Sequence, residues 1–199
     1  MTHPDKKVCI FTQFSDNPEA YSLNRVVKDQ LKMLLKGGYK PTVIVAESFE
    51  PSGIYAEKNV TIKKIPLVPV HNEVKKDETF ESDVQDLYRA LKEILADVDV
   101  VITHDIIYQP AALKHNVAAR KVADEFSKLK WLHWIHSATS PAVLTNLKPY
   151  FEDAYIATLQ KPFPHSLYVF FNDYSIPRIA KNFQVPEDMV AVVHHPSDL

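Results

Sequence analysis

The chain has 199 residues, of which 46% are hydrophobic and 24% are charged, and its formal net charge is -2. These totals suit a single soluble domain, and the Lys and Arg residues are spread along the chain, which argues against a nucleic-acid or membrane-surface footprint. The lone cysteine, Cys9, excludes a disulfide within the chain, and no segment reaches the roughly 20 apolar residues of a membrane span. We therefore expect a cytoplasmic protein.

Glycine is unusually rare in this sequence. Gly37, Gly38 and Gly53 are the only three glycines, whereas average usage gives about fourteen in a chain of this length. The GxGxxG loop of dinucleotide-binding dehydrogenases and the Walker A loop of P-loop NTPases both need several glycines in a short span. The sequence therefore excludes both kinds of glycine-rich phosphate loop.

The first half of the chain alternates strand and helix patterns. A helix begins at Ser22 and ends at the Gly37–Gly38 stop, and a second helix is predicted over 82–96, where one stripe of the helix is apolar. Residues 71–79 are polar and predict a loop. Apolar runs rich in β-branched residues predict strands over 7–14, 41–46, 60–70 and 98–103.

The second half continues the alternation. Helices are predicted over 111–126, from the Ser140–Pro141 start signal, and after Ser175, which is expected to cap its helix. Strands are predicted over 130–135, 167–171 and 189–193. Such alternation implies right-handed crossovers and a mostly parallel sheet flanked by helices. We predict one α/β domain over 1–199, of the Rossmann-like, doubly wound class.

Polar residues follow several of the predicted strands. Because ligands of open α/β sheets bind beyond the carboxyl ends of the strands, we expect these side chains to line one edge and to converge on a polar ligand. The residues are Gln13, Ser15, Asp16 and Asn17 after the first strand, and the pairs His104–Asp105, His136–Ser137 and Asn172–Asp173.

Each pair can instead be only the cap of the following helix. Asn172–Asp173 fits that interpretation best, because a helix follows directly. Both interpretations stay open for His104–Asp105, where Pro110 delays the next helix and leaves a loop. His136 favours a functional role, because it ends an aromatic-rich strand and precedes a capped helix. His133 shares a strand face with Trp131, and we interpret it as structural.

Other chemistries find less support. His104 and His136 with a carboxylate could bind zinc in principle, but no HxxxH or HExxH helix spacing is present. Ser137 lacks the glycine-flanked turn of a serine nucleophile. Cys9 lies within a predicted strand and is expected in the core. We therefore expect no metal and no covalent nucleophile.

The order of these elements resembles the N-terminal domain of the two-domain GT-B glycosyltransferases, especially the retaining family 4. The segments that carry the resemblance are LLKGGYKPTVIVA, DVDVVITHD, WLHWIHS, LYVFFNDYSIPRIAKNFQVPED and MVAVVHHPSDL. Together they span essentially the whole chain. The sequence departs from the family in the loop 13–21, which has no glycine, and in HHPSDL, which replaces the usual Asn-Gly-Val-Asp ending.

The resemblance implies roles for particular residues. His136 matches the family's catalytic-site histidine beside the donor sugar and pyrophosphate, with Ser137 as its neighbour. His104 and Asp105 would border the acceptor pocket. Ser15 and Asn17 would stand in for the missing glycine loop as substrate-binding side chains. Asn172 is included as a further substrate-binding candidate.

The resemblance also implies a function for a longer parent protein. A hexosyltransferase-type enzyme would move a sugar from a nucleotide-sugar donor to an acceptor hydroxyl, without a metal or cofactor. The donor would bind mainly to a C-terminal domain, so we expect this chain to be an excised N-terminal half that is inactive alone. Two alternatives are half of a sugar-nucleotide epimerase and a non-catalytic binding domain of the same fold. The acceptor is not identified.

Overall fold

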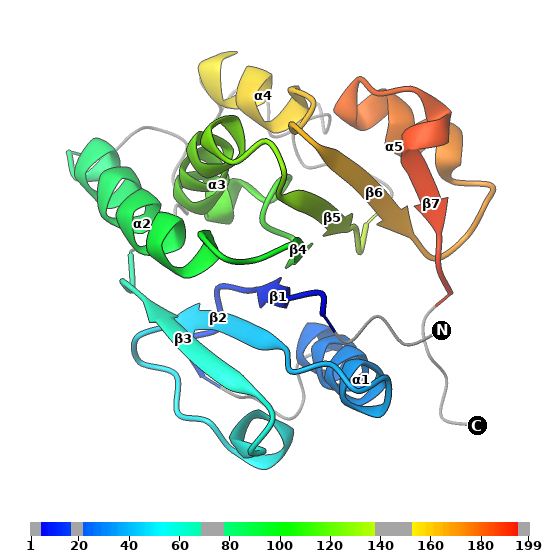
Figure 1. Cartoon of the computed structure of the whole chain (residues 1–199). Helices are drawn as coiled ribbons and strands as arrows, with labels where there is room; N and C mark the ends of the chain where they lie inside the picture. Colours follow the sequence, from blue (N-terminus) through cyan, green and yellow to red (C-terminus); the bar gives the residue numbers. More distant parts are fainter. Residues whose placement is uncertain (1–4, 17–21, 69–77, 138–152, 195–199) are drawn as a thin grey trace.

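The structure is a computed structural model that describes residues 5–16, 22–68, 78–137 and 153–194. Within these ranges seven strands form one sheet in the order β3-β2-β1-β4-β5-β6-β7, and every neighbouring pair is parallel (Figure 1). The strands are β1 (Val8–Phe11), β2 (Thr42–Ala46), β3 (Thr61–Ile65), β4 (Val100–His104), β5 (Lys130–Trp134), β6 (Ser166–Phe170) and β7 (Val190–Val192). This order confirms the predicted Rossmann-like, doubly wound class.

Helices cover both faces of the sheet. Helices α2, α3, α4 and α5 lie over one face, and α1 lies over the other together with the short η1 turn (Figure 1). The helices are α1 (Ser22–Lys36), α2 (Phe80–Leu95), α3 (Leu113–Glu125), α4 (Asp153–Gln160) and α5 (Ile176–Phe183), and the 3-10 turns are η1 (Gly53–Ala56), η2 (Pro110–Ala112) and η5 (Glu187–Met189). Both layers are needed because parallel strands are apolar on both faces.

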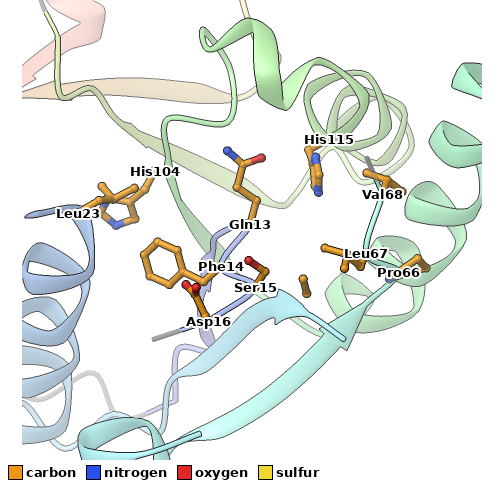
Figure 2. A pocket seen from close by; sticks show the side chains of 11 residues that line it. Gln13, Phe14, Ser15, Asp16, Leu23, Pro66, Leu67, Val68, His104 and His115 are labelled. Carbon is orange, nitrogen blue, oxygen red and sulfur yellow. The ribbon is translucent and has the colours of Figure 1, made fainter. Parts of the chain in front are cut away.

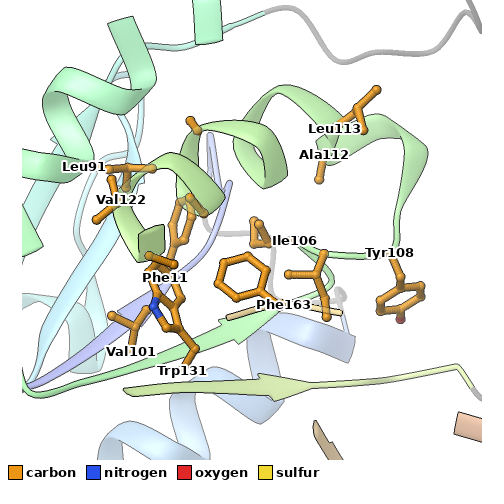
Figure 3. Close-up of a cluster of buried hydrophobic side chains, with 14 of the residues drawn as sticks. Phe11, Leu91, Val101, Ile106, Tyr108, Ala112, Leu113, Val122, Trp131 and Phe163 are labelled. Atoms are coloured by element: carbon orange, nitrogen blue, oxygen red, sulfur yellow. The ribbon is translucent and has the colours of Figure 1, made fainter. Parts of the chain in front are cut away.

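Two apolar clusters, one on each face, form the core. Successive residues of a strand point to opposite faces, so Phe11 and Ile10 enter different clusters. The cluster beneath α2 and α3 contains Phe11, Val101 and Trp131 (Figure 3). The cluster beneath α1 contains Ile10, Val27, Leu31, Ile102 and Trp134. Cys9 is fully buried in the first cluster, as its place in an apolar run predicted.

Several element boundaries differ from the predictions. Strand β3 ends at Ile65, directly before Pro66, because proline has no N–H to donate to a ladder. Helix α4 was not predicted from its sequence, and the helix predicted from Ser140 lies outside the described residues. Ser175 occupies the N-cap position of α5 but its side chain makes no capping hydrogen bond. Instead, the backbone N–H of Ser175 donates to Asn172 Oδ1 at 3.0 Å.

The segment after β4 is not the open loop that Pro110 suggested. Ile106, Ile107 and Tyr108 are each at most 1% exposed and belong to the core beneath α3. The side-chain amide of Asn116 donates to the Ile107 carbonyl at 2.8 Å, which ties the segment to α3. The chain leaving β4 is therefore held in place at the carboxyl edge of the sheet.

Candidate functional site

The candidate site lies where the strand order changes direction. From β1 the chain proceeds outward through β2 to β3, whereas β4 and the later strands build the sheet on the other side of β1. The crevice at the carboxyl ends of β1 and β4 is the switch point at which doubly wound sheets bind ligands. Residues 12–16 leave β1 at this point, and His104 is the last residue of β4.

A cavity of about 210 Å³ opens in this crevice. Figure 2 shows His104 near one end and His115 near the other, with Gln13 and Ser15 between them. The full lining is Gln13, Phe14, Ser15, Asp16, Leu23, Ala46, Pro66, Leu67, Val68, His104 and His115. The prediction that Ser15 and His104 share one edge of the sheet agrees with this arrangement.

Backbone contacts hold the glycine-free loop after β1. The N–H of Ala46 donates to the Phe14 carbonyl at 2.8 Å, and the Ser48 hydroxyl donates to the Ser15 carbonyl at 3.0 Å. Phe14 is buried, while Ser15 and Asp16 are exposed at the mouth of the cavity. Both Ser15 and Asp16 line the cavity.

His104 and His136 contact each other directly. His104 Nδ1 lies 3.0 Å from His136 Nε2, and the two rings stack with centroids 5.3 Å apart. On its other side, His104 Nε2 lies 2.8 Å from Gln30 Oε1 of helix α1. His104 is 1% exposed, whereas His136 is half-buried at the end of β5. The two strand-end histidines thus form one unit that links the cavity to the edge beyond β5.

Asp105 and Tyr108 support this unit from the adjoining segment. The Tyr108 hydroxyl donates to Asp105 Oδ1 and accepts a hydrogen bond from the backbone N–H of His136 at 3.3 Å. Burial raises the pKa of the Asp105 carboxyl above its ordinary value, although hydrogen bonds from Tyr108 and the His136 backbone oppose the shift. Burial, and then the Asp105 charge, raise the pKa of the Tyr108 phenol as well. The hydroxyl is therefore held protonated as a donor to Asp105.

His115 belongs to the site but was not predicted from the sequence. It lies in the first turn of α3, is 6% exposed, and its ring is tilted by 47° against that of Phe11, with the ring centroids 6.2 Å apart. Its Nδ1 has no hydrogen-bond partner among the described residues. Burial, with a smaller contribution from the Lys114 charge, lowers its pKa to about 4, so the ring is neutral near pH 7. The sequence feature that could have identified His115 as a site residue is its position in the first turn of the helix that follows β4.

Comparisons with known proteins identify the fold. The structure of WaaG, a glycosyltransferase involved in lipopolysaccharide biosynthesis, aligns with a TM-score of 0.54 and 11% identity over 93% of this chain and 44% of that chain. Sucrose-phosphate synthase from Thermosynechococcus elongatus aligns with a TM-score of 0.55 and 13% identity over 84% of this chain and 42% of that chain. The fold is that of a GT-B half.

The chain spans less than half the length of either solved structure. No protein-family model matches its sequence, and no curated protein does. The likeness at 11–13% identity is therefore one of fold. Within the described part of the chain, no helix is long and apolar enough to cross a bilayer.

The remaining predicted site residues are Ser137, Asn17 and Asn172. Ser137 is exposed after β5, and Asn17 lies outside the described residues. Asn172 follows β6, two strands away from β4, and its amide oxygen accepts the Ser175 N–H. The structure therefore does not bring Asn172 into the His104–His136 unit, and the capping interpretation accounts for its contact.

His133 is structural, as interpreted from its place beside Trp131. It is fully buried, its Nδ1 lies 2.8 Å from the Thr103 hydroxyl, and its ring meets Phe163 with centroids 4.5 Å apart. Burial, with the Arg120 charge second, lowers its pKa well below the ordinary value. Among the described residues, no group of three or more His, Cys, Asp or Glu side chains is arranged to hold a metal ion.

Proposed function

We propose that this chain is the N-terminal, acceptor-side half of a glycosyltransferase that moves a sugar from a nucleotide-sugar donor to an acceptor hydroxyl. The supporting observation is the hydrogen-bonded His104–His136 pair at the carboxyl edge of the sheet, beside a cavity at the switch point. The likeness in fold to glycosyltransferase structures supports the same class of reaction. The donor would bind mainly to a second domain.

His136 is the side chain that we assign to the donor. It is half-buried at the end of β5, and its backbone and ring are both held by hydrogen bonds, so its orientation is fixed before a ligand arrives. Its ring would hydrogen-bond the donor sugar or its phosphate. Charge on the leaving phosphate would be offset by helix N-termini and basic side chains, largely in the second domain, without a metal.

The cavity is the part of the site that we assign to the acceptor. Gln13, Ser15 and His115 bring neutral hydrogen-bonding groups to the cavity, His104 and the Asp16 carboxylate also line it, and the rest of the lining is apolar, which suits an acceptor hydroxyl. At about 210 Å³ the cavity is smaller than the roughly 300–1,000 Å³ of pockets that enclose a drug-sized ligand. We take this as support for one wall of a cleft that a second domain completes.

Ligand titration of the 199-residue chain tests this proposal. With UDP-glucose followed by ¹⁵N NMR, we expect weak, millimolar binding that shifts resonances at His136, Asp105 and Gln13, and no sugar transfer. His136→Asn should weaken this binding by about tenfold, which corresponds to about 1.4 kcal/mol. The matched control is His165→Asn, because His165 is exposed at the opposite, amino end of β6, and the control should leave binding unchanged.

Two results would contradict the proposal. Micromolar binding together with turnover by this chain alone would show that no second domain is needed. Equal binding by the wild-type chain and His136→Asn would remove His136 from the site and favour a non-catalytic binding domain. For a longer protein that contains this chain, an isomerised sugar nucleotide as the product, in place of a new glycoside, would favour the epimerase alternative.

A further inference from the structure

His115 brings a buried side chain without a protein partner to the wall of the cavity. It is 6% exposed, and Figure 2 shows its ring extending from α3 toward Leu67 and Val68, which line the same cavity. The ring makes no hydrogen bond with any described residue, and its Nδ1 is closed to solvent. Nε2, the ring nitrogen farther from the backbone, is therefore the atom that can meet a ligand. A buried imidazole without a partner is uncommon in a folded protein, and a ligand in the cavity would supply the missing contact.

The lining of the cavity holds no ammonium or guanidinium group for an anionic ligand. Its titratable side chains among the described residues are Asp16, His104 and His115. Burial, with the Lys114 charge second, lowers the pKa of His115 to about 4, so this ring is neutral near pH 7. The Lys114 ammonium pairs with Asp83 at 2.6 Å, and the lysine side chain is 1% exposed. A phosphate or carboxylate would therefore meet the Asp16 carboxylate at the mouth without a Lys or Arg partner from the lining.

The segment Pro66–Val68, which we call the apolar strip, directly follows β3 and forms part of the lining. Leu67 is 50% exposed, and its backbone N–H donates to Glu47 Oε1 at 3.3 Å, which helps to hold the strip in place. A cavity of about 150 Å³ accommodates a benzene ring, and this cavity has about 210 Å³. One ring-sized apolar group that carries a hydroxyl therefore fits between the apolar strip and His115.

We infer that His115 and the apolar strip form a subsite that selects an uncharged alcohol whose hydroxyl is attached to a compact apolar group. A hydroxyl both donates and accepts, so it suits Nε2 in either neutral tautomer of the His115 ring. The apolar group would pack on Leu67 and Val68. That this alcohol is the acceptor of the sugar rests on the proposed function, whereas the selectivity of the subsite does not.

Three probes of similar shape test the subsite on the 199-residue chain. Benzyl alcohol carries the apolar ring and the hydroxyl, toluene lacks the hydroxyl, and 4-(hydroxymethyl)benzoate adds a negative charge. In NMR titrations we expect benzyl alcohol to bind in the millimolar range and to shift the methyl signals of Leu67 and Val68. The absence of such shifts would overturn the subsite.

The carboxylate probe tests the selection against charge. It should bind about tenfold more weakly than benzyl alcohol at low salt, because the Asp16 carboxylate repels it. Asp16 is exposed, so Asp16→Asn should leave the fold intact and should bring the two affinities closer together. A carboxylate probe that binds the wild-type chain as tightly as benzyl alcohol would overturn this part of the inference.

His115→Phe tests the contact with the hydroxyl. Phenylalanine keeps a ring at this position and removes the unpartnered nitrogen, so the variant should fold. It should weaken the binding of benzyl alcohol about fivefold relative to that of toluene, as expected for one lost hydrogen bond. The ratio of the two dissociation constants is the readout, because it cancels any general change in the cavity. An unchanged ratio would show that His115 does not contact the hydroxyl.

Leu67→Ala tests the apolar strip without disturbing the core. It should weaken benzyl alcohol and toluene by the same factor, about threefold, because both lose the same packing surface. The matched control is Met33→Ala, because Met33 is also 50% exposed but lies on α1 and is not part of the lining. Equal effects of the two substitutions would remove the strip from the subsite.

The UDP-glucose titration separates this inference from the proposed function. If the alcohol probes bind as expected but UDP-glucose binds equally to the wild-type chain and His136→Asn, the proposed function loses its support while the subsite stands. If His136→Asn weakens UDP-glucose binding but no alcohol probe shifts Leu67 or Val68, the subsite is wrong while the proposed function stands.

Discussion

At the scale of single residues, Asp105 shows how the site constrains its backbone. Its φ is 58°, in the left-handed region that few residues other than glycine adopt, although aspartate tolerates it better than most. The conformation turns the chain out of β4 and lets the Asp105 carboxylate accept from Tyr108. The same tyrosine holds the His136 backbone. The strained residue therefore couples the ends of β4 and β5.

Asp105→Asn should change how stability depends on pH. Burial raises the pKa of Asp105, so the folded protein holds this proton more tightly than the unfolded chain does. The contribution of Asp105 to the free energy of unfolding therefore falls as pH rises from about 3.8 through its folded pKa. Asparagine keeps an acceptor oxygen and tolerates the same φ but does not ionise. Urea unfolding should show the variant gaining stability relative to wild type between pH 4 and pH 7, and a constant difference would contradict this.

At the scale of elements, Arg120 joins two helices that are distant in sequence. Its guanidinium donates from α3 to the carbonyls of Pro162 at 2.8 Å, Lys161 at 2.6 Å and Thr158 at 3.3 Å, all at the carboxyl end of α4. Its Nε donates to Asn116 Oδ1 at 2.8 Å, and its cation lies 4.9 Å from the centre of the Phe163 ring. A positive charge at this end also suits the helix dipole.

Arg120→Met should destabilise the protein by about 3 kcal/mol, because it leaves several partly buried carbonyls without a donor. Arg120→Lys should recover part of that loss, since an ammonium keeps the charge but cannot reproduce the planar fork. Urea unfolding measures the loss, and amide hydrogen exchange should localise it to α4. Arg178→Met, at an exposed position of α5, should stay within about 0.5 kcal/mol of wild type. Equal losses at both arginines would refute the capping role.

At the scale of the whole molecule, buried neutral histidines make the fold sensitive to acid. His115 lies in the first turn of α3 and His133 on β5, and burial lowers the pKa of each. The unfolded chain binds protons at these rings at a pH where the folded protein does not. The two neutral rings therefore make their full contribution to the free energy of unfolding above about pH 6.5, and this contribution declines as the solution is acidified.

His115→Gln should make the protein less sensitive to acid. The pKa of His115 falls from 6.5 to about 4, so protonation of the unfolded chain costs the wild-type protein about 3 kcal/mol between those pH values. Between pH 6.5 and pH 4, the free energy of unfolding of the variant should therefore fall by about 3 kcal/mol less than that of the wild-type protein. Urea titrations at pH 7, 5.5 and 4 measure the difference. Parallel pH profiles would show that His115 is not buried as a neutral ring.

The predictions that succeeded depend on local periodicity. Helix α1 begins at the predicted Ser22, and strands β4 and β5 end at His104 and Trp134, each one residue from its predicted end. Helix α4 was not predicted, because its sequence has weak amphipathic character. Its carboxyl end is held by hydrogen bonds from Arg120 of α3, a contact that the local sequence does not reveal. Ser175 was predicted to cap α5 from its residue type, but the neighbouring Asn172 oxygen makes the contact.

The sequence by itself determined the class of fold and the edge of the sheet where chemistry would gather, because apolar spacing and strand-end polarity are local properties of the chain. Only the tertiary structure decided which polar residues meet. Gln30 lies 74 residues from His104, and His104 lies 32 residues from His136. His115 enters the cavity only because η2 and α3 return across the carboxyl ends of the strands. Such contacts depend on strand order and helix packing, which bring together residues far apart in the chain.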